Sequence, residues 1–197
     1  MILVVGLGNP GPRYALTRHN AGFLVIDALS LAPLAKGRRV AAFQARFEGQ
    51  YSELELAGKH VGLLKPETFM NASGRSVLAA MAALKLEPEA LLVVHDELDI
   101  AFGELRLKVG GGDGGHRGIR SISTELNTPN YGRLRVGIGR PPPDFQGDIA
   151  DFVLQAASPE EQVGLVSVLE RASEVVESVV TDGLSQAMNR TNQRTVR

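Results

Sequence analysis

With 197 residues, the chain is long enough to bury a sizeable core as one domain. Hydrophobic residues make up 44% and charged residues 22%, a balance that excludes a disordered or fibrous protein. The chain has no cysteine, which excludes disulfides, thiolate metal sites and a cysteine nucleophile, and its formal net charge is −1.

The hydrophobic pattern changes repeatedly between the strand period and the helix period. In chain order, the predicted elements are a strand at 2–6, a helix at 19–32, strands at 43–49, 51–58 and 60–66, a helix at 71–86, strands at 91–99 and 103–110, a loop at 110–115, a helix at 116–126, a strand at 133–139 and a long helix from Ser158. Gly58 and Lys59 are expected to form a hairpin turn, and Asn71 or Ser73 to cap the helix that follows it.

This alternation, without a linker or an internal repeat, predicts an α/β fold. We expect a single domain over 1–197, a three-layer α/β/α sandwich around a mixed β-sheet. Ser158, Pro159 and Glu161 are typical of a helix start, so we place a C-terminal helix at about 158–182 and a basic tail at 183–197.

No apolar run approaches the roughly 20 residues that a helix needs to cross a bilayer. The first residues enter a predicted strand directly, without the positively charged start of a signal peptide. We therefore expect a soluble, unprocessed protein of the cytoplasm that makes no contact with a membrane.

Charge is unevenly distributed along the chain. The region 108–140 has two acidic residues, Asp113 and Glu125, against six basic ones, namely Lys108, Arg117, Arg120, Arg133, Arg135 and Arg140. Residues 144–182 carry nine acidic residues and only Arg171 as a basic one. A basic sector beside an acidic one indicates contact with a polyanion at one place on the surface.

The opening loop has glycines at 6, 8 and 11, spaced as in the G-x-G-x-x-G fingerprint of dinucleotide-binding folds. Pro10 and Pro12 interrupt these glycines where the fingerprint's helix has to begin. Asp27 lies about as far along the sequence from the glycines as the acidic residue that binds the ribose in such folds. It falls, however, inside a predicted helix instead of at the end of a strand. The context therefore argues against a cofactor loop, and we expect no cofactor.

Polar residues gather where apolar strands end. Asn9 follows the first strand, His19 opens the next helix, and His95 and Asp96 end a later strand. The carboxyl ends of strands in open α/β sheets are where ligand clefts form.

Five stretches of the sequence, in order and spacing, resemble bacterial peptidyl-tRNA hydrolase. They are VVGLGNPGPRYALTRHNAGF, LLKPETFMNASG, VVHDELD, GGGDGGHRGIRSI and YGRLRVGIGRP. The match runs from about residue 2 to 141, and the helical tail is compatible with it. The resemblance implies hydrolysis of the ester that joins a peptide to the ribose of tRNA, without a metal or a covalent intermediate. The absence of G-x-S-x-G and H-E-x-x-H patterns agrees with this.

In this resemblance, His19 matches the catalytic histidine, and an imidazole is a natural base near neutral pH. Asp96 matches its partner carboxylate, which would fix the tautomer of the ring and stabilise the imidazolium. The alternatives are a solvent-facing histidine at a helix start and a simple turn acid at a strand end.

Asn9 and Asn71 match substrate-binding asparagines, whose amides suit a peptide backbone or a developing oxyanion. Their alternative roles are a turn residue and a helix cap. Tyr14 and Met70 are also expected to bind substrate; Met70 matches a cleft position, although a methionine is often plain core.

One position departs from the family pattern. Arg117 stands where the family often has asparagine, and a guanidinium donates hydrogen bonds but cannot accept them. We carry Arg117 over as a substrate-binding residue, and leave the preceding His116 as a neighbour of the site.

Lys108 and Arg135 match basic residues that in the family hold the phosphate at the 5′ end of the tRNA. Phosphate contacts position a substrate without reading its sequence. The alternative is a solvated basic strand face, since Arg133 and Arg135 alternate as strand residues do.

Two further interpretations stay open at this level. The cluster His95, Asp96, Glu97 and Asp99 suggests a metallohydrolase, although neighbouring strand residues point to opposite faces. The other interpretation is a module that binds RNA at 108–140 and catalyses no reaction. We favour a monomeric enzyme that acts on peptidyl-tRNA with neither metal nor cofactor.

Overall fold

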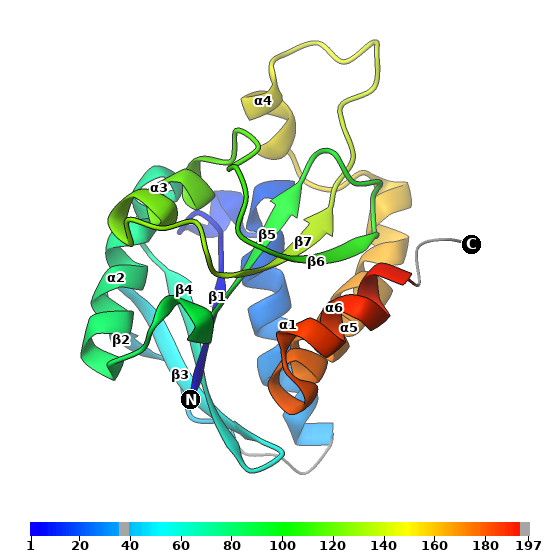
Figure 1. Ribbon diagram of the computed structural model, residues 1–197. Coiled ribbons are helices and arrows are strands. Elements are labelled where there is room, and N and C mark those ends of the chain that lie inside the picture. The colour runs from blue at the N-terminus through cyan, green and yellow to red at the C-terminus, as the bar shows by residue number, and fades with distance from the viewer. Residues whose placement is uncertain (36–39, 194–197) are drawn as a thin grey trace.

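The computed structural model describes residues 1–35 and 40–193, and within them the strands form one mixed seven-stranded sheet (Figure 1). The strand order is β2-β3-β4-β1-β5-β7-β6. The bounds are β1 Ile2–Gly6, β2 Gln44–Arg46, β3 Gly49–Leu56, β4 Lys59–Pro66, β5 Leu91–Glu97, β6 Leu105–Val109 and β7 Gly132–Gly137.

Four neighbouring strands run parallel, because β1 pairs in parallel with β4 and β5, and β5 pairs in parallel with β7. The β2–β3–β4 side and the β6–β7 edge are antiparallel. The carboxyl ends of β1, β4, β5 and β7 therefore meet at one edge of the sheet. Asn9, Met70 and Asp96 lie at or just after three of these ends, so the topology brings them to one place.

Helices cover both faces of the sheet, which confirms the predicted three-layer α/β/α architecture. In Figure 1, α2 and α3 lie on one face and α1, α5 and α6 on the other, while α4 stands beyond the arrowheads of β5 and β7. The bounds are α1 Ala21–Ala35, α2 Ser73–Leu84, α3 Arg117–Glu125, α4 Ile149–Val153, α5 Pro159–Asp182 and α6 Leu184–Gln193. No helix in the described ranges is both long and apolar enough to span a membrane.

The first strand is apolar throughout because both of its faces are covered. Leu3 and Val5 pack into the core under α2 and α3, whereas Val4 packs into the core under α1 and α5. Because successive strand side chains point to opposite faces, a strand in the middle of such a sheet needs a continuous apolar run.

The glycines at the end of β1 allow a close approach of backbones. A Cβ added at Gly6 would lie 2.2 Å from the carbonyl oxygen of Gly22, and one added at Gly22 would lie 2.3 Å from the amide nitrogen of Leu7. The start of α1 therefore packs directly against the end of β1. This contact gives Gly6 of the opening loop a packing role and brings the residues just before α1 to the carboxyl edge of the sheet.

Three local expectations need correction. The hairpin between β3 and β4 turns at Ala57 and Gly58, one residue earlier than predicted, and both have positive φ, as a two-residue hairpin turn requires. Helix α2 begins after Ala72 without a side-chain cap, so neither Asn71 nor Ser73 caps it.

The C-terminal region contains two helices. Helix α5 starts at the Ser158 capping box, in which Glu161 bonds back to the Ser158 backbone. The segment expected as a basic tail forms α6 up to Gln193, and its last residues, 194–197, lie outside the described part.

Candidate active site

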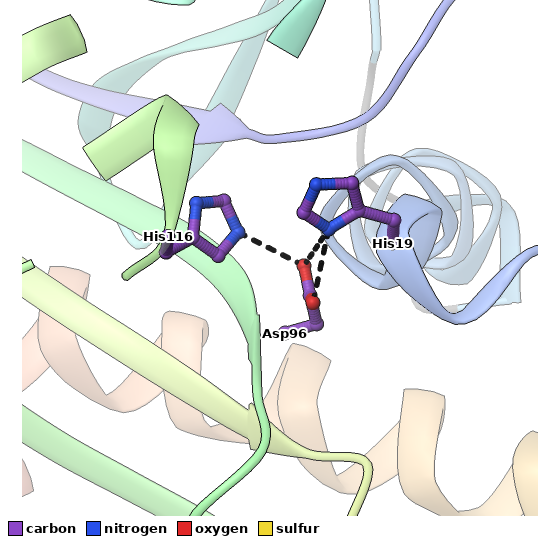
Figure 2. A group of neighbouring side chains, drawn as sticks. All are labelled: His19, Asp96 and His116. Carbon is purple, nitrogen blue, oxygen red and sulfur yellow. Dashed lines mark hydrogen bonds and ion pairs between the residues drawn. The ribbon is translucent and has the colours of Figure 1, made fainter. Parts of the chain in front are cut away.

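His19 lies in a short 3₁₀ turn, Arg18–Asn20, immediately before α1. Its Nδ1 lies 2.9 and 3.0 Å from the two carboxylate oxygens of Asp96, which is 77 residues away in sequence (Figure 2). Asp96 is buried near the end of β5. The structure thus brings the predicted pair into direct contact.

The orientation of the His19 ring follows from this contact. A carboxylate only accepts hydrogen bonds, so Nδ1 of the neutral ring carries the proton and donates it to Asp96. The second ring nitrogen, Nε2, points away from Asp96 in Figure 2. Its lone pair is therefore available on the side of the cavity that His19 lines.

His116 is a second partner of Asp96 that the sequence interpretation left as a neighbour. It is the N-cap of α3, and its Nδ1 accepts from the amides of Gly118 and Ile119 at 3.1 and 3.3 Å. The proton of the neutral ring is then on Nε2, which donates to Asp96 Oδ1 at 3.0 Å. One carboxylate oxygen thus accepts from two imidazoles.

Electrostatics in this cluster favour an ionised Asp96. Burial alone would raise the pKa of Asp96, but the hydrogen bonds and charges of His19 and His116 hold it well below its ordinary value. Burial alone would lower the pKa of His19, but the Asp96 carboxylate more than offsets this, and the net pKa is raised. The positive charge of Arg117 lowers the pKa of His19 and offsets part of the rise.

His95, next to Asp96, is completely enclosed in the protein. Its Nδ1 donates to the Asp96 carbonyl oxygen at 2.7 Å, and its Nε2 has no partner among the described residues. Burial and the neighbouring His116 lower its pKa well below the ordinary value, which favours a neutral ring. His95 thus supports the backbone of Asp96.

The metal-binding quartet suggested by the sequence does not form. Glu97 pairs with Arg135 and Asp99 with Arg140, away from the Asp96 carboxylate. Among the residues described, the three side chains whose donor atoms could hold an ion are His19, Asp96 and His116, within 4.8 Å of one another. A cation there would have to replace the two N–H groups that donate to Asp96.

Asn9 is held in one orientation by three hydrogen bonds. Its Oδ1 accepts from the Met70 amide at 3.0 Å, and its backbone amide donates to Asn20 Oδ1 at 2.8 Å. The Asn20 side-chain amide donates in turn to the Asn9 carbonyl oxygen at 3.0 Å. Because Oδ1 is occupied, Nδ2 is the donor that the side chain of Asn9, a residue lining the cavity described below, has left to offer. Asn20 is a supporting residue that the sequence analysis did not single out.

His19 and Asn9 line a cavity of about 670 Å³ at the carboxyl edge of the sheet. Met70 and Asn71 line it as well; Met70 also belongs to the core under α2 and α3, so both interpretations of it apply. Residues 148–150, 153 and 154, in and beside α4, form one wall.

Two other predicted substrate-binding residues differ in their position. Arg117 is the first residue of α3, is exposed and lines the cavity without a bonded partner among the described residues. Tyr14 lies in a 3₁₀ turn, Pro12–Tyr14, outside the residues that line the cavity, and its hydroxyl contacts the Arg13 guanidinium.

The two predicted phosphate-binding residues lie on neighbouring strands, Lys108 on β6 and Arg135 on β7. Arg135 donates through Nε to Glu97 at 2.9 Å, and its two terminal nitrogens have no hydrogen-bond partner among the described residues. Partial burial and the nearby charges of Arg133 and Arg135 lower the pKa of Lys108.

Arg133 is not on a solvated strand face, contrary to one of the alternatives above. It is 2% exposed, and its guanidinium donates to the carbonyl oxygens of Gly111 and Gly112 at 3.0 and 2.7 Å. A buried arginine therefore shapes the glycine loop that leads to His116.

Comparison with known proteins identifies the family. A family model described as peptidyl-tRNA hydrolase matches residues 3–197. The chain belongs to the peptidyl-tRNA hydrolase family. The match includes the helical tail, which the sequence motifs alone did not cover.

Individual members of the family are similar over nearly their whole length. The peptidyl-tRNA hydrolase of Sorangium cellulosum is 50% identical, and the alignment covers 98% of this chain and 85% of that protein. The one from Geotalea uraniireducens is 47% identical, over 98% and 96% of the two chains. A crystal structure of the peptidyl-tRNA hydrolase from Acinetobacter baumannii has a TM-score of 0.85 at 40% identity, covering 98% of this chain and 94% of that one.

Asp96 raises and Arg117 lowers the pKa of His19, so a change at Arg117 should shift this pKa measurably. Replacing Arg117 with alanine removes a positive charge that disfavours the imidazolium, so the pKa of His19 should rise further above about 6.5. Nitrogen-15 NMR titration of His19 measures this directly. Arg120→Ala removes the same charge from the same helix at an exposed position paired with Asp113, and should leave the His19 pKa unchanged. A lower or unaltered His19 pKa in Arg117→Ala would contradict the assigned electrostatics.

Proposed function

We propose that this chain hydrolyses the ester between a peptide, or an N-blocked amino acid, and the 3′ ribose of tRNA, with His19 as the base. Family membership makes the chain a peptidyl-tRNA hydrolase, which is an ester hydrolase. The observation that supports the base assignment is the hydrogen bond from His19 Nδ1 to Asp96, which leaves Nε2 facing the cavity.

In the proposed reaction, His19 Nε2 takes a proton from water as the water oxygen bonds to the ester carbonyl carbon. Asp96 stabilises the imidazolium that forms, as the carboxylate of a serine-protease triad does. The bond from the carbonyl carbon to the ribose oxygen then breaks, and the imidazolium returns the proton to that oxygen. The products are a free peptide acid and a tRNA with a free hydroxyl.

Amide donors are proposed to stabilise the negative charge on the carbonyl oxygen. Asn9 offers Nδ2 because its Oδ1 is bonded to the Met70 amide. Asn71 lines the same cavity and is not used as a helix cap. Donors that are already oriented towards the developing charge stabilise the transition state more than the ester itself.

The other side chains of the cavity have supporting roles in the proposal. His116 bonds the same Asp96 oxygen as His19 and is proposed to keep the carboxylate fixed. Arg117 contributes donors only, towards the peptide or the CCA end of the tRNA. Met70 supplies an apolar surface, and Tyr14 remains a predicted substrate contact outside the cavity lining.

Lys108 and Arg135 are proposed to hold a phosphate of the tRNA. Both have N–H groups that no described residue accepts, and they occupy adjacent strands of the basic sector. Phosphate contacts of this kind suit an enzyme that accepts many tRNAs.

A pure RNA-binding module explains less of the structure. The His19–Asp96–His116 cluster and Asn9 line a cavity away from β6 and β7, the strands that carry Lys108 and Arg135. Binding of a phosphate group does not require these side chains. We propose one catalytic domain acting as a monomer in the cytoplasm, where peptidyl-tRNA lost from the ribosome has to be recycled. The proposed chemistry uses neither a metal nor a cofactor.

The base assignment predicts the effect of His19→Ala on release of deacylated tRNA from N-acetyl-aminoacyl-tRNA by purified protein. Loss of a general base typically lowers turnover by about 10² to 10⁴-fold. Affinity for tRNA should be retained, because the basic pair is untouched. His60→Ala, at an exposed histidine on the hairpin, should behave as wild type. Near-normal turnover in His19→Ala would disprove the assignment.

The phosphate contacts predict a change in salt dependence. Lys108→Ala and Arg135→Ala should each raise KM and reduce the slope of log KM against log salt by about one. Arg75→Ala, on α2 and paired with Glu48, is the matched control and should leave the slope unchanged. If the slope in the two test variants equals that of wild type, the tRNA binds elsewhere.

A further inference from the structure

Arg18, the residue before His19, is a buried charged side chain that the proposed chemistry does not use. Its side chain is 8% exposed, and Nη2 donates to Glu161 Oε2 at 2.6 Å. Its Nη1 donates to the carbonyl oxygen of Ala156 at 2.9 Å. Ala156 lies in the segment that joins α4 to α5, and Glu161 lies in the first turn of α5, 138 and 143 residues further along the chain.

Arg18 also contacts α4 itself. The guanidinium carbon lies 4.3 Å from the centroid of the Phe152 ring, a cation–π contact with a residue that is 4% exposed. The backbone amide of Arg18 donates to the carbonyl oxygen of Gln155 at 3.0 Å, and Thr17 forms an isolated antiparallel β-bridge with Ala156. The turn that carries His19 is therefore joined to α4 and to the residues that follow it.

Glu161 gives this contact a fixed anchor. The oxygen that accepts from Arg18 also accepts from the Ser158 amide at 2.6 Å, within the capping box of α5. Because α5 packs against α1, the carboxylate is held by a long helix of the main body. We use the name Arg18 clamp for the contacts of Arg18 with Phe152, Ala156 and Glu161.

Stability alone does not favour an arginine here. Its Nε is buried and has no acceptor among the described residues, and a buried unpaired N–H is costly. An apolar side chain of similar volume would avoid that cost and is often equally or more stabilising than a buried ion pair. The geometry of the clamp, with three partners fixed around one planar group, indicates that its role is orientation.

We propose that Arg18 is a positioning residue that holds α4 above the catalytic turn. Ile149, Val153 and Leu154 of this region line the same cavity as His19, so the clamp orders this wall of the cavity before substrate binds. A wall that is already ordered spares the free-energy cost of ordering it on binding. The inference rests on the proposed role of His19 in this cavity.

The proposal predicts a change in KM rather than in kcat. Phe152→Leu removes the aromatic face while keeping an apolar side chain of similar size, and Phe152→Tyr keeps the face. Loss of a partly buried cation–π contact should raise KM for N-acetyl-aminoacyl-tRNA about five- to tenfold in Phe152→Leu, and leave Phe152→Tyr within about twofold of wild type. The pH dependence of kcat should not move, because the bond from His19 to Asp96 is intact. Amide hydrogen exchange in Phe152→Leu should accelerate over 148–156 and stay as in wild type elsewhere in the protein.

A second pair of variants separates the clamp from the helix cap. Glu161→Ala removes both the partner of Arg18 and the cap, whereas Ser158→Ala weakens only the cap. KM should rise in Glu161→Ala and not in Ser158→Ala.

Wild-type KM in both Phe152→Leu and Glu161→Ala, or an equal rise in Ser158→Ala, would overturn the role of Arg18. These outcomes are distinct from failure of the proposed function. If the proposed function is wrong, His19→Ala would retain turnover, regardless of the KM values of the Phe152 and Glu161 variants.

Discussion

The hydrogen bond between the His19 ring and Asp96 is the contact on which the site depends. It exists because the start of α1 lies against the end of β1, where Gly6 and Gly22 let two backbones approach within a distance that a side chain would prevent. The same contact sets the tautomer of His19 and leaves Nε2 pointing away from Asp96, in a ring that lines the cavity. A glycine pattern that resembles a cofactor loop thus serves the packing of the turn that carries His19.

Three consecutive residues of that turn hold three different parts of the site. Arg18 contacts α4 and the start of α5, His19 contacts Asp96 on β5, and Asn20 holds the loop of Asn9. The contacts of Arg18 and His19 join segments that are 77 or more residues apart in sequence. The turn therefore fixes the proposed base, its carboxylate partner, the proposed oxyanion donor and the α4 wall of the cavity relative to one another, as the proposed ester hydrolysis requires.

Much of the fold and part of the site could be predicted from sequence because apolar periodicity and strand ends are local signals. The pairing of His19 with Asp96 followed from the family resemblance, and both residues stand at element ends where clefts form. His116 was not predicted as a partner, since its position depends on a side-chain cap at α3 that spacing does not reveal. The sequence leaves a solvated strand face open as an alternative for Arg133, because alternation alone cannot show that its guanidinium is bonded to the carbonyl oxygens of the glycine loop.

The central claim is that Asp96 and the α3 cap set opposite tautomers in two neighbouring histidines. Long-range proton–nitrogen-15 correlation spectra of the imidazoles, recorded above the pKa of His19 and assigned with single-histidine variants, read each tautomer directly. The account predicts a proton on Nδ1 of His19 and on Nε2 of His116. A proton on Nε2 of His19 would contradict it, because the ring would then have no lone pair facing the cavity with which to accept a proton from water.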